Sequence, residues 1–186
     1  EAQRAERRTT LQDSVEFACQ FYEQKLRSPE GRVAYDYLRD RGLSDDIIKK
    51  YRLGYAPNGN ALKGSLSRDS IPEDVAIEAR ILSPGQDGRS SFDFFRDRVM
   101  FPICDARGRP VAFGGRVLGE GGPKYLNSPE TPLFHKGHLV YAFSQARKEA
   151  SEKAEIIVAE GYMDVIALAQ AGINNAVAPL GTALTE

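Results

Sequence analysis

The sequence contains little of what marks a membrane protein, a secreted scaffold or a zinc site. Among 186 residues there is no tryptophan, and there are only two histidines and two cysteines. No apolar run approaches the ~20 residues that a membrane helix needs, and the charged first residues lack the apolar stretch of a signal peptide. Cys19 and Cys104 lack metal-ligand spacing, so we expect both thiols to be reduced and buried. These absences predict a cytoplasmic protein without a membrane partner.

The chain as a whole is almost neutral, but two of its segments carry opposite charge excesses. The net charge is −1. Residues 89–148 contain ten Lys and Arg against five acids, a net of +5, and residues 149–186 contain one Lys against six acids, a net of −5. A basic segment before an acidic one suits a protein that holds a polyanion beside a cation site. The alternative is chance clustering on solvated surfaces.

The front of the chain is predicted to be mostly helical. Apolar residues at three-and-four spacing predict a helix over 5–27. A second helix starts at Ser28-Pro29-Glu30 and ends at Gly42, and a third, capped by Ser44, runs through Lys50. Beyond these we expect a strand over 51–56, a turn over 57–60, a helix over 72–80 and a loop over 84–88.

The pattern then changes to strands. Residues 98–104 and 110–118 flank a five-residue loop, which predicts an antiparallel hairpin. Gly114-Gly115 marks a bulge or a close backbone approach. Further on we expect a strand over 139–143, a helix capped by Ser144, a strand over 155–159 covered on both faces, a helix over 162–171 and a strand over 175–178.

The last three of these elements form a βαβ unit, which sets the predicted fold class. That class is α/β: a basic α+β subdomain of helices and an antiparallel sheet, followed by the first βαβ part of a parallel sheet. We place the domain boundary after His138, with a basic N-terminal subdomain over 1–138 and the start of a second domain over 139–186.

Two carboxylates lie where such a sheet would hold a ligand. In an open parallel sheet the ligand site lies beyond the carboxyl ends of the strands. Glu160 stands at that end of the first buried strand, Gly161 allows a sharp exit, and Asp164 falls in the first turn of the next helix. Hard oxygen donors there suit Mg²⁺ or Mn²⁺. The alternatives are a strand-end acid facing water and an acid that stabilises the helix dipole.

The run Glu160-Gly161-Tyr162-Met163-Asp164-Val165-Ile166-Ala167-Leu168 closely resembles the opening motif of the Toprim fold, which primases, topoisomerases and some nucleases share. That resemblance implies that Glu160 is the catalytic acid/base or a metal-site residue and that Asp164 supports the metal site. Gly181-Thr182 is similar to the loop that follows the second strand of that fold. The parallel sheet would then be the first part of a Toprim sheet.

The basic segment resembles bacterial DNA primases. Four stretches match in sequence and order, at 99–103, 113–119, 123–131 and 134–137, and the stretch 39–44 matches an earlier part of the same core. The resemblance implies a groove that handles the template and the incoming nucleotide. Its predicted residues are Arg41, Arg116, Lys124, Tyr125, Asn127 and Lys136, with Tyr125 offering a stacking face. The alternatives are solvated surface charges, a packed aromatic residue at 125 and a turn residue at 127.

The function that this resemblance implies is the synthesis of short RNA primers during DNA replication by metal-assisted nucleotidyl transfer. The implied partners are single-stranded DNA template, ribonucleoside triphosphates and RNA primer. Zinc is expected only in an N-terminal domain that this sequence lacks, and the replicative helicase would bind a C-terminal domain that it also lacks. The alternatives are a Toprim nuclease or topoisomerase, and a non-catalytic nucleic-acid-binding module.

Residues 1–186 alone should make no primers. The resemblance implies that an Asp-x-Asp pair on later strands, beyond Glu186, binds most of the metal, so Glu160 and Asp164 would supply only part of the site. Incubation with template, ribonucleoside triphosphates and Mg²⁺, beside the full-length protein, measures this. Template-dependent product at the rate of the full-length protein would refute it.

Overall fold

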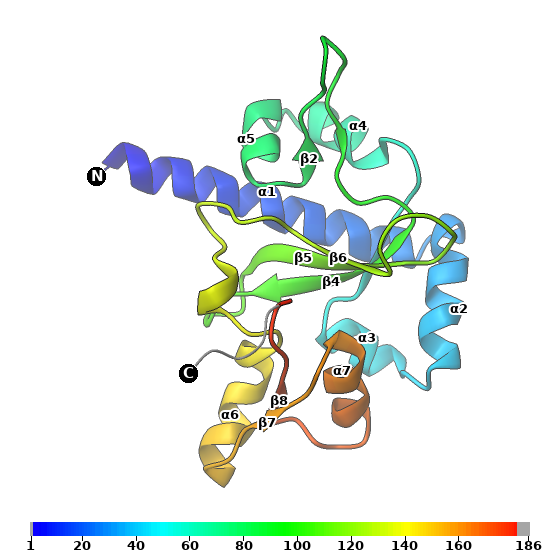
Figure 1. The fold of residues 1–186 in the computed structure, drawn as a ribbon, viewed down its shortest axis with the longest axis vertical. Helices are drawn as coiled ribbons and strands as arrows, with labels where there is room; N and C mark the ends of the chain where they lie inside the picture. The colour runs from blue at the N-terminus through cyan, green and yellow to red at the C-terminus, as the bar shows by residue number, and fades with distance from the viewer. Residues whose placement is uncertain (1, 182–186) are drawn as a thin grey trace.

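The computed structural model describes residues 2–181, and an antiparallel sheet of order β1-β4-β5-β6 lies at its centre. Helix α1 (Ala2–Leu26) runs along one side of this sheet, and the C-terminal elements lie on the other (Figure 1). The strands are β1 (Gly54–Ala56), β4 (Arg98–Cys104), β5 (Pro110–Val117) and β6 (Tyr125–Asn127). The predicted hairpin of β4 and β5 is confirmed, with a register shift at Ile103/Cys104 before the loop.

The predicted helices at the front are confirmed, with small changes of boundary. Ser44 caps α3 as predicted, because its Oγ accepts a hydrogen bond from the Ile47 N–H (3.3 Å). Gly42 follows α2 with a φ of +81°, a conformation that glycine adopts readily. The elements are the 3-10 turn η1 (Pro29–Gly31), α2 (Arg32–Asp40), α3 (Asp45–Lys50) and α5 (Glu73–Glu78).

One helix and three strands were not predicted from the sequence. Helix α4 (Ala61–Arg68) contains Gly64 and two serines, which are weak helix formers. Its first turn is stabilised from outside, because the Asp93 carboxylate accepts the N–H groups of Leu62 and Lys63 (2.9 Å each). Asp93 lies in β3 (Phe92–Asp93), which pairs with β2 (Leu82–Ser83) around the predicted loop. Strand β6 was not predicted either, and the strand predicted over 51–56 is shorter, at Gly54–Ala56.

The βαβ unit near the C-terminus is confirmed. Strand β7 (Ile157–Val158) pairs in parallel with β8 (Ala176–Val177), and α7 (Tyr162–Gln170) connects them. Two details of the prediction are wrong. Residues 139–143 form only an isolated bridge from Tyr141 to Ala178, and α6 (Phe143–Lys153) begins one residue before Ser144, which therefore does not cap it. Ala142 at the actual cap has a φ of +67°, which turns the chain out of the extended conformation.

Strand β7 is also not covered on both faces. Ile156 and Val158 are 46% and 48% exposed, and among the described residues β7 pairs only with β8. An unbroken apolar run shows that a strand can be buried, but it does not show which neighbours cover it. No helix within residues 2–181 is both long and apolar enough to cross a lipid bilayer.

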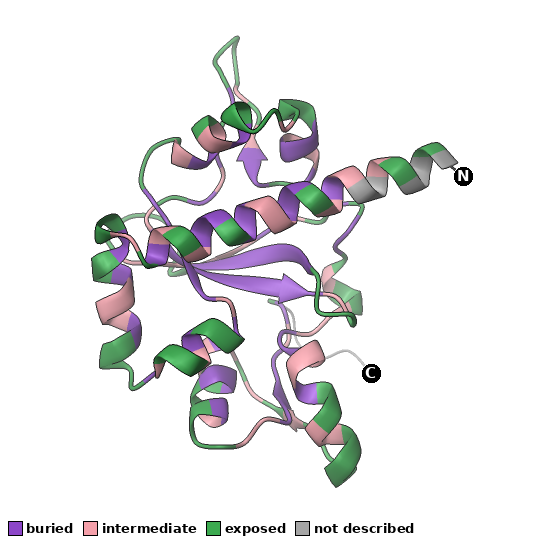
Figure 2. Cartoon of the chain, turned by 180° about the vertical axis from the view of Figure 1, so that it is seen from behind, coloured by how far each residue is buried: buried purple, intermediate pink, exposed green. Residues whose placement is uncertain are grey.

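The two faces of the central sheet pack against different parts of the chain. Figure 2 shows β4 and β5 buried over most of their length, and successive side chains of a strand point to opposite faces. Phe113 contacts Tyr22 of α1, with ring centroids 5.2 Å apart. The next residue, Gly114, lies against Tyr162 at the start of α7, where an added Cβ would be 2.5 Å from the ring Cζ. The predicted close approach at Gly114 is therefore confirmed.

Substitution Gly114→Ala should lower the free energy of unfolding by about 1–3 kcal/mol, because the new methyl group overlaps the Tyr162 ring and overpacks the core. Urea denaturation followed by circular dichroism measures this. Gly64→Ala is the matched control, since Gly64 lies in α4 with no atom within 4 Å of an added Cβ. That change should be neutral or stabilise by up to about 1 kcal/mol. Equal stability of Gly114→Ala and the wild type would contradict the contact.

Candidate nucleic-acid and metal site

Glu160 and Asp164 lie in the turn that connects β7 to α7. The backbone is held to β8 up to Ala159, whose N–H donates to the Val177 carbonyl (2.8 Å). Glu160 follows, and Gly161 is the extended residue before α7. Both carboxylates belong to exposed residues. One Asp164 oxygen, Oδ2, accepts the Gly161 N–H (3.1 Å), so Asp164 also has the helix-capping role that its position in the first turn suggested.

Tyr162 attaches this turn to the central sheet. Its buried ring stacks on Phe101 (centroids 5.1 Å apart, 9° between planes) and meets Tyr141 edge-on (4.6 Å, 87°). Its hydroxyl donates to the Asn127 Oδ1 (2.5 Å). Burial raises the pKa of Tyr162, so the hydroxyl keeps the proton that it donates. Asn127, a predicted site residue, is thereby fixed beside the residues that flank Glu160.

The β5–β6 hairpin carries four of the predicted groove residues. Tyr125 lies directly opposite Arg116, and Asn127 lies opposite Gly114. Paired residues of neighbouring strands share a face, so Arg116, Tyr125 and Asn127 lie on the face that Tyr162 covers. The Tyr125 ring centroid is 6.1 Å from that of Tyr162, and Tyr125 is 38% exposed. Lys124 precedes it, and its carbonyl accepts the Val117 N–H (3.0 Å).

Arg41 joins the same cluster through an aromatic ring on α2. The guanidinium carbon of Arg41 lies 4.0 Å from the centroid of the Tyr37 ring, and that of Arg116 lies 4.8 Å from it. Burial raises the pKa of Tyr37, and the two nearby arginines oppose that rise. The structure therefore brings Arg41, Arg116 and Tyr125 together at one end of the hairpin.

Lys136 is not brought to this cluster by any described contact. It begins the 3-10 turn η2 (Lys136–His138), and its backbone N–H donates to the Glu130 Oε1 (3.2 Å). The chain leaves β6 past Ser128, which bonds to Phe113 rather than to the Arg116 end of β5. Its place in the groove stays a prediction. Gly181 lies near the Asn127 amide, while Thr182 of the predicted loop falls outside the described residues.

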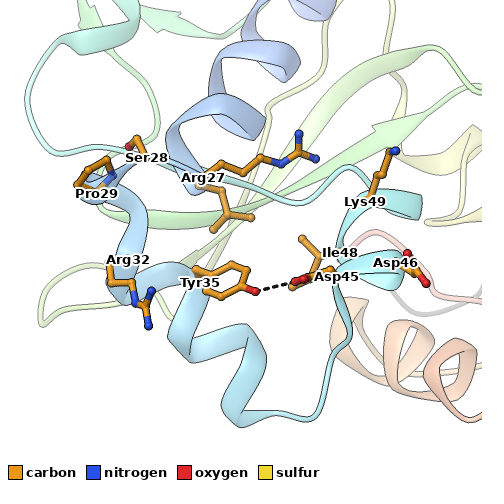
Figure 3. Close-up of a pocket in the computed structure, with 10 residues that line it drawn as sticks. Arg27, Ser28, Pro29, Arg32, Tyr35, Asp45, Asp46, Ile48 and Lys49 are labelled. Carbon is orange, nitrogen blue, oxygen red and sulfur yellow. Dashed lines mark hydrogen bonds between the residues drawn. The ribbon is translucent and has the colours of Figure 1, made fainter.

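A cavity of about 990 Å³ lies elsewhere, between the end of α1, η1, α2 and α3 (Figure 3). Within it the Tyr35 hydroxyl donates to the Asp45 Oδ1 (2.6 Å). None of the predicted site residues lines this cavity. Its lining consists of Leu26, Arg27, Ser28, Pro29, Arg32, Tyr35, Asp45, Asp46, Ile48 and Lys49. The candidate site is therefore an open surface beside α7 and the β5–β6 hairpin, not this cavity.

Sequence reasoning missed two aromatic residues that organise the candidate site. Tyr162 lies inside the motif that contains Glu160 and Asp164, and Tyr37 precedes Arg41 by one helical turn. An aromatic residue one turn before an arginine on a helix is a weak sequence signal for a cation–π pair. No comparable signal connects Tyr37 with Arg116, which is distant in the sequence.

Comparison with known proteins places this arrangement in a family. The family described as DNA primase catalytic core, N-terminal domain, matches residues 21–147, which is more than half of the chain. The chain belongs to this primase family. A Toprim domain matches residues 154–186, the part that contains β7, α7, β8, Glu160 and Asp164. The expected family and fold class are therefore confirmed.

Individual relatives agree with this family. The DNA primase of Pseudomonas putida is 55% identical over 175 residues, which are 92% of this chain and 26% of that protein. A solved DnaG primase catalytic domain bound to single-stranded DNA has a TM-score of 0.87 and 45% identity, over 97% of this chain and 56% of that chain. The RNA polymerase domain of Mycobacterium tuberculosis primase DnaG has a TM-score of 0.90 and 31% identity, and the match covers 96% of this chain and 59% of that chain. The chain thus spans about a quarter of the length of the curated relatives.

The residues present fit part of the site that a divalent ion would need. The Glu160 carboxylate and the second oxygen of Asp164 form no hydrogen bond with another described residue. Mg²⁺ commonly binds one or two carboxylates and retains several waters. Among residues 2–181, however, no group of three or more His, Cys, Asp or Glu side chains lies together as a ligand set.

Because Asp164 caps α7, Asp164→Ala should lower the free energy of unfolding by about 1 kcal/mol, whereas Asp164→Asn should retain most of the capping through its amide oxygen. Glu160→Ala is the control and should leave stability within about 0.5 kcal/mol of the wild type. Thermal and urea unfolding without added metal measure all three. If Asp164→Ala and Glu160→Ala had the same stability, the capping role would be wrong.

Proposed function

We propose that this chain forms part of the polymerase core of an enzyme that synthesises RNA primers on single-stranded DNA. The observation that supports it best is the hydrogen bond from Tyr162 to Asn127, which joins the turn bearing Glu160 to the hairpin bearing Arg116, Lys124 and Tyr125. Groups suited to phosphates and groups suited to a divalent ion thus lie on adjoining parts of one surface. Membership of the primase family supports the same reading.

In this proposal the cations of the cluster bind the phosphates of template and incoming nucleotide. Arg41 and Arg116 present forked guanidinium groups, which bind phosphate oxygens in pairs. Lys124 and Lys136 add charge without fixed direction. Tyr125, which is partly exposed beside Arg116, offers a ring on which a base stacks. Asn127 is held by Tyr162, and its amide nitrogen donates no hydrogen bond to a described residue.

The carboxylates Glu160 and Asp164 would hold Mg²⁺ or Mn²⁺ at the other side of this surface. When bound, the divalent ion neutralises the triphosphate and the departing pyrophosphate. Glu160 is the freer of the two, since Asp164 also caps α7, and we propose Glu160 as the residue that contacts the reacting groups. Gly161 keeps the turn short, so both acids stay next to the sheet.

The activity and partners of the whole protein are part of this proposal. They include primer synthesis from ribonucleoside triphosphates, contact with a replicative helicase through a C-terminal domain, and zinc in an N-terminal domain. We also propose a domain boundary after His138 and a cytoplasmic location.

Glu160→Gln in the full-length protein should lower ribonucleotide incorporation on a single-stranded template by about 100-fold or more, the range expected on loss of a catalytic acid or base. Single-stranded DNA affinity should be unchanged or slightly higher, because a negative charge is removed. Glu152→Gln, an exposed acid at the end of α6, is the matched control and should retain full activity. Incorporation at the normal rate by Glu160→Gln would show that this acid has no catalytic role.

The basic groove should appear in the salt dependence of binding. Replacing Lys124 and Lys136 together by Ala should weaken single-stranded DNA binding and flatten the plot of log K against log salt by about 1.4, since each phosphate contact contributes about 0.7. The pair Lys49→Ala and Lys153→Ala, on α3 and α6, is the control. Flattening by only about 0.7 would mean that one of the two lysines contacts no phosphate. If Lys124→Ala alone produced all of that change, Lys136 would lie outside the groove. An unchanged slope would place the groove elsewhere.

A further inference from the structure

Tyr37 lies against two guanidinium groups that come from different parts of the fold. Arg41 follows it at the C-cap of α2, and Arg116 reaches the same ring from β5. Their guanidinium carbons are 4.0 Å and 4.8 Å from the ring centroid. Both are within the distance at which an aromatic ring attracts a cation. One ring therefore sets the separation between two cations that are distant in the sequence.

No acid neutralises this pair of cations within residues 2–181. Arg116 donates from Nη1 to the Val117 carbonyl (2.7 Å), and its buried Nε has no hydrogen-bond partner there. Neither arginine lies within ion-pair distance of a described carboxylate, whereas Arg109 has one such partner and Arg52 has two. Two adjacent cations without an acid attract an anion, and a phosphate group accepts hydrogen bonds from both.

The ring of Tyr37 makes both cation–π contacts. The hydroxyl oxygen is buried and has no hydrogen-bond partner among the described residues. The ring is also one of the partly buried side chains that pack against the hydrophobic core. Each arginine held on the ring loses rotamer freedom before a ligand arrives, so binding then costs less conformational entropy. A phenylalanine at this position would keep both effects.

We propose that Tyr37 is a positioning residue whose ring holds Arg41 and Arg116 as one two-pronged phosphate-binding unit. This proposal rests on the proposed function, because the phosphate belongs either to the DNA strand or to the triphosphate of the incoming ribonucleotide. Tyr125, opposite Arg116 on the same face of the sheet, places a stacking surface for a base beside the unit.

The test uses the full-length protein with Tyr37→Leu and Tyr37→Phe. A fluorescein-labelled thymidine oligomer measures strand affinity, and steady-state incorporation measures KM and kcat for the ribonucleotide. Tyr37→Leu should weaken the oligomer affinity or raise the nucleotide KM about fivefold, the size of one to two cation–π contacts, and leave kcat within about twofold. A change in oligomer affinity would assign the phosphate to the DNA strand, and a change in KM would assign it to the ribonucleotide. Tyr37→Phe should stay within about twofold of the wild type in both arms.

Tyr35→Leu is the matched control on the same helix. Its ring lies 6.0 Å from the Arg32 guanidinium and its hydroxyl bonds to Asp45, away from the candidate site. The variant should be less stable than the wild type, but its affinity for the oligomer and its KM for the ribonucleotide should be unchanged. In a protein that already carries Arg41→Gln and Arg116→Gln, Tyr37→Leu should have no further effect, because the residue acts through those arginines.

Three results would overturn the proposal. Unchanged affinity and KM in Tyr37→Leu, with an active wild type, would remove the positioning role and leave the proposed function standing. A Tyr37→Phe variant as weak as Tyr37→Leu would assign the effect to the hydroxyl. A wild-type protein that neither binds the oligomer nor incorporates ribonucleotides would overturn the proposed function and this proposal with it.

Discussion

The contact of the Tyr162 ring with the backbone at Gly114 is the constraint on which the candidate site depends. The ring fills the space that any side chain at 114 would occupy, so the start of α7 reaches the sheet more closely than two side-chained elements could. Phe101 and Tyr141 pack on the same ring, and Asn127 binds its hydroxyl. A rigid aromatic side chain held on several sides keeps the adjacent turn, and with it Glu160, in a fixed place relative to the sheet.

The alternation of side chains along β5 separates packing from the site. Phe113 faces α1 and contributes to an apolar layer with Tyr22 and Phe95. Gly114 and Arg116 face the other side, where α7, Tyr125 and the α2 ring at Tyr37 lie. Since the two faces come from alternate residues of one strand, a shift of register by one residue would exchange them. The buried face therefore fixes the register, and the register fixes which residues reach the candidate site.

Local sequence signals predicted the elements whose stabilising contacts are local. The capped helix α3, the β4–β5 hairpin and the βαβ unit at the C-terminus were all found in this way. Helix α4 was missed because its first turn is capped by Asp93, far along the chain. The exposure of β7 was missed because an apolar run does not show which elements, if any, cover the strand. For the site, a motif identified Glu160 and Asp164, but the pairing of Arg41 with Arg116 arises only from tertiary packing on Tyr37.

The basic part of the chain, residues 89–148, and the acidic part, residues 149–181, contact each other without salt bridges. Among the described residues, no ion pair joins 89–148 to 149–181, and the contacts between them include aromatic rings, a glycine, the tyrosine–asparagine hydrogen bond and the backbone bridge from Tyr141 to Ala178. Had the two parts been joined by salt bridges, each pair would have removed one cation and one carboxylate from the surface and opposed the binding of a phosphate–metal complex. Apolar contacts need no such pairing and are insensitive to salt. The fold can therefore hold opposite charges near each other while both remain available to a ligand that carries both.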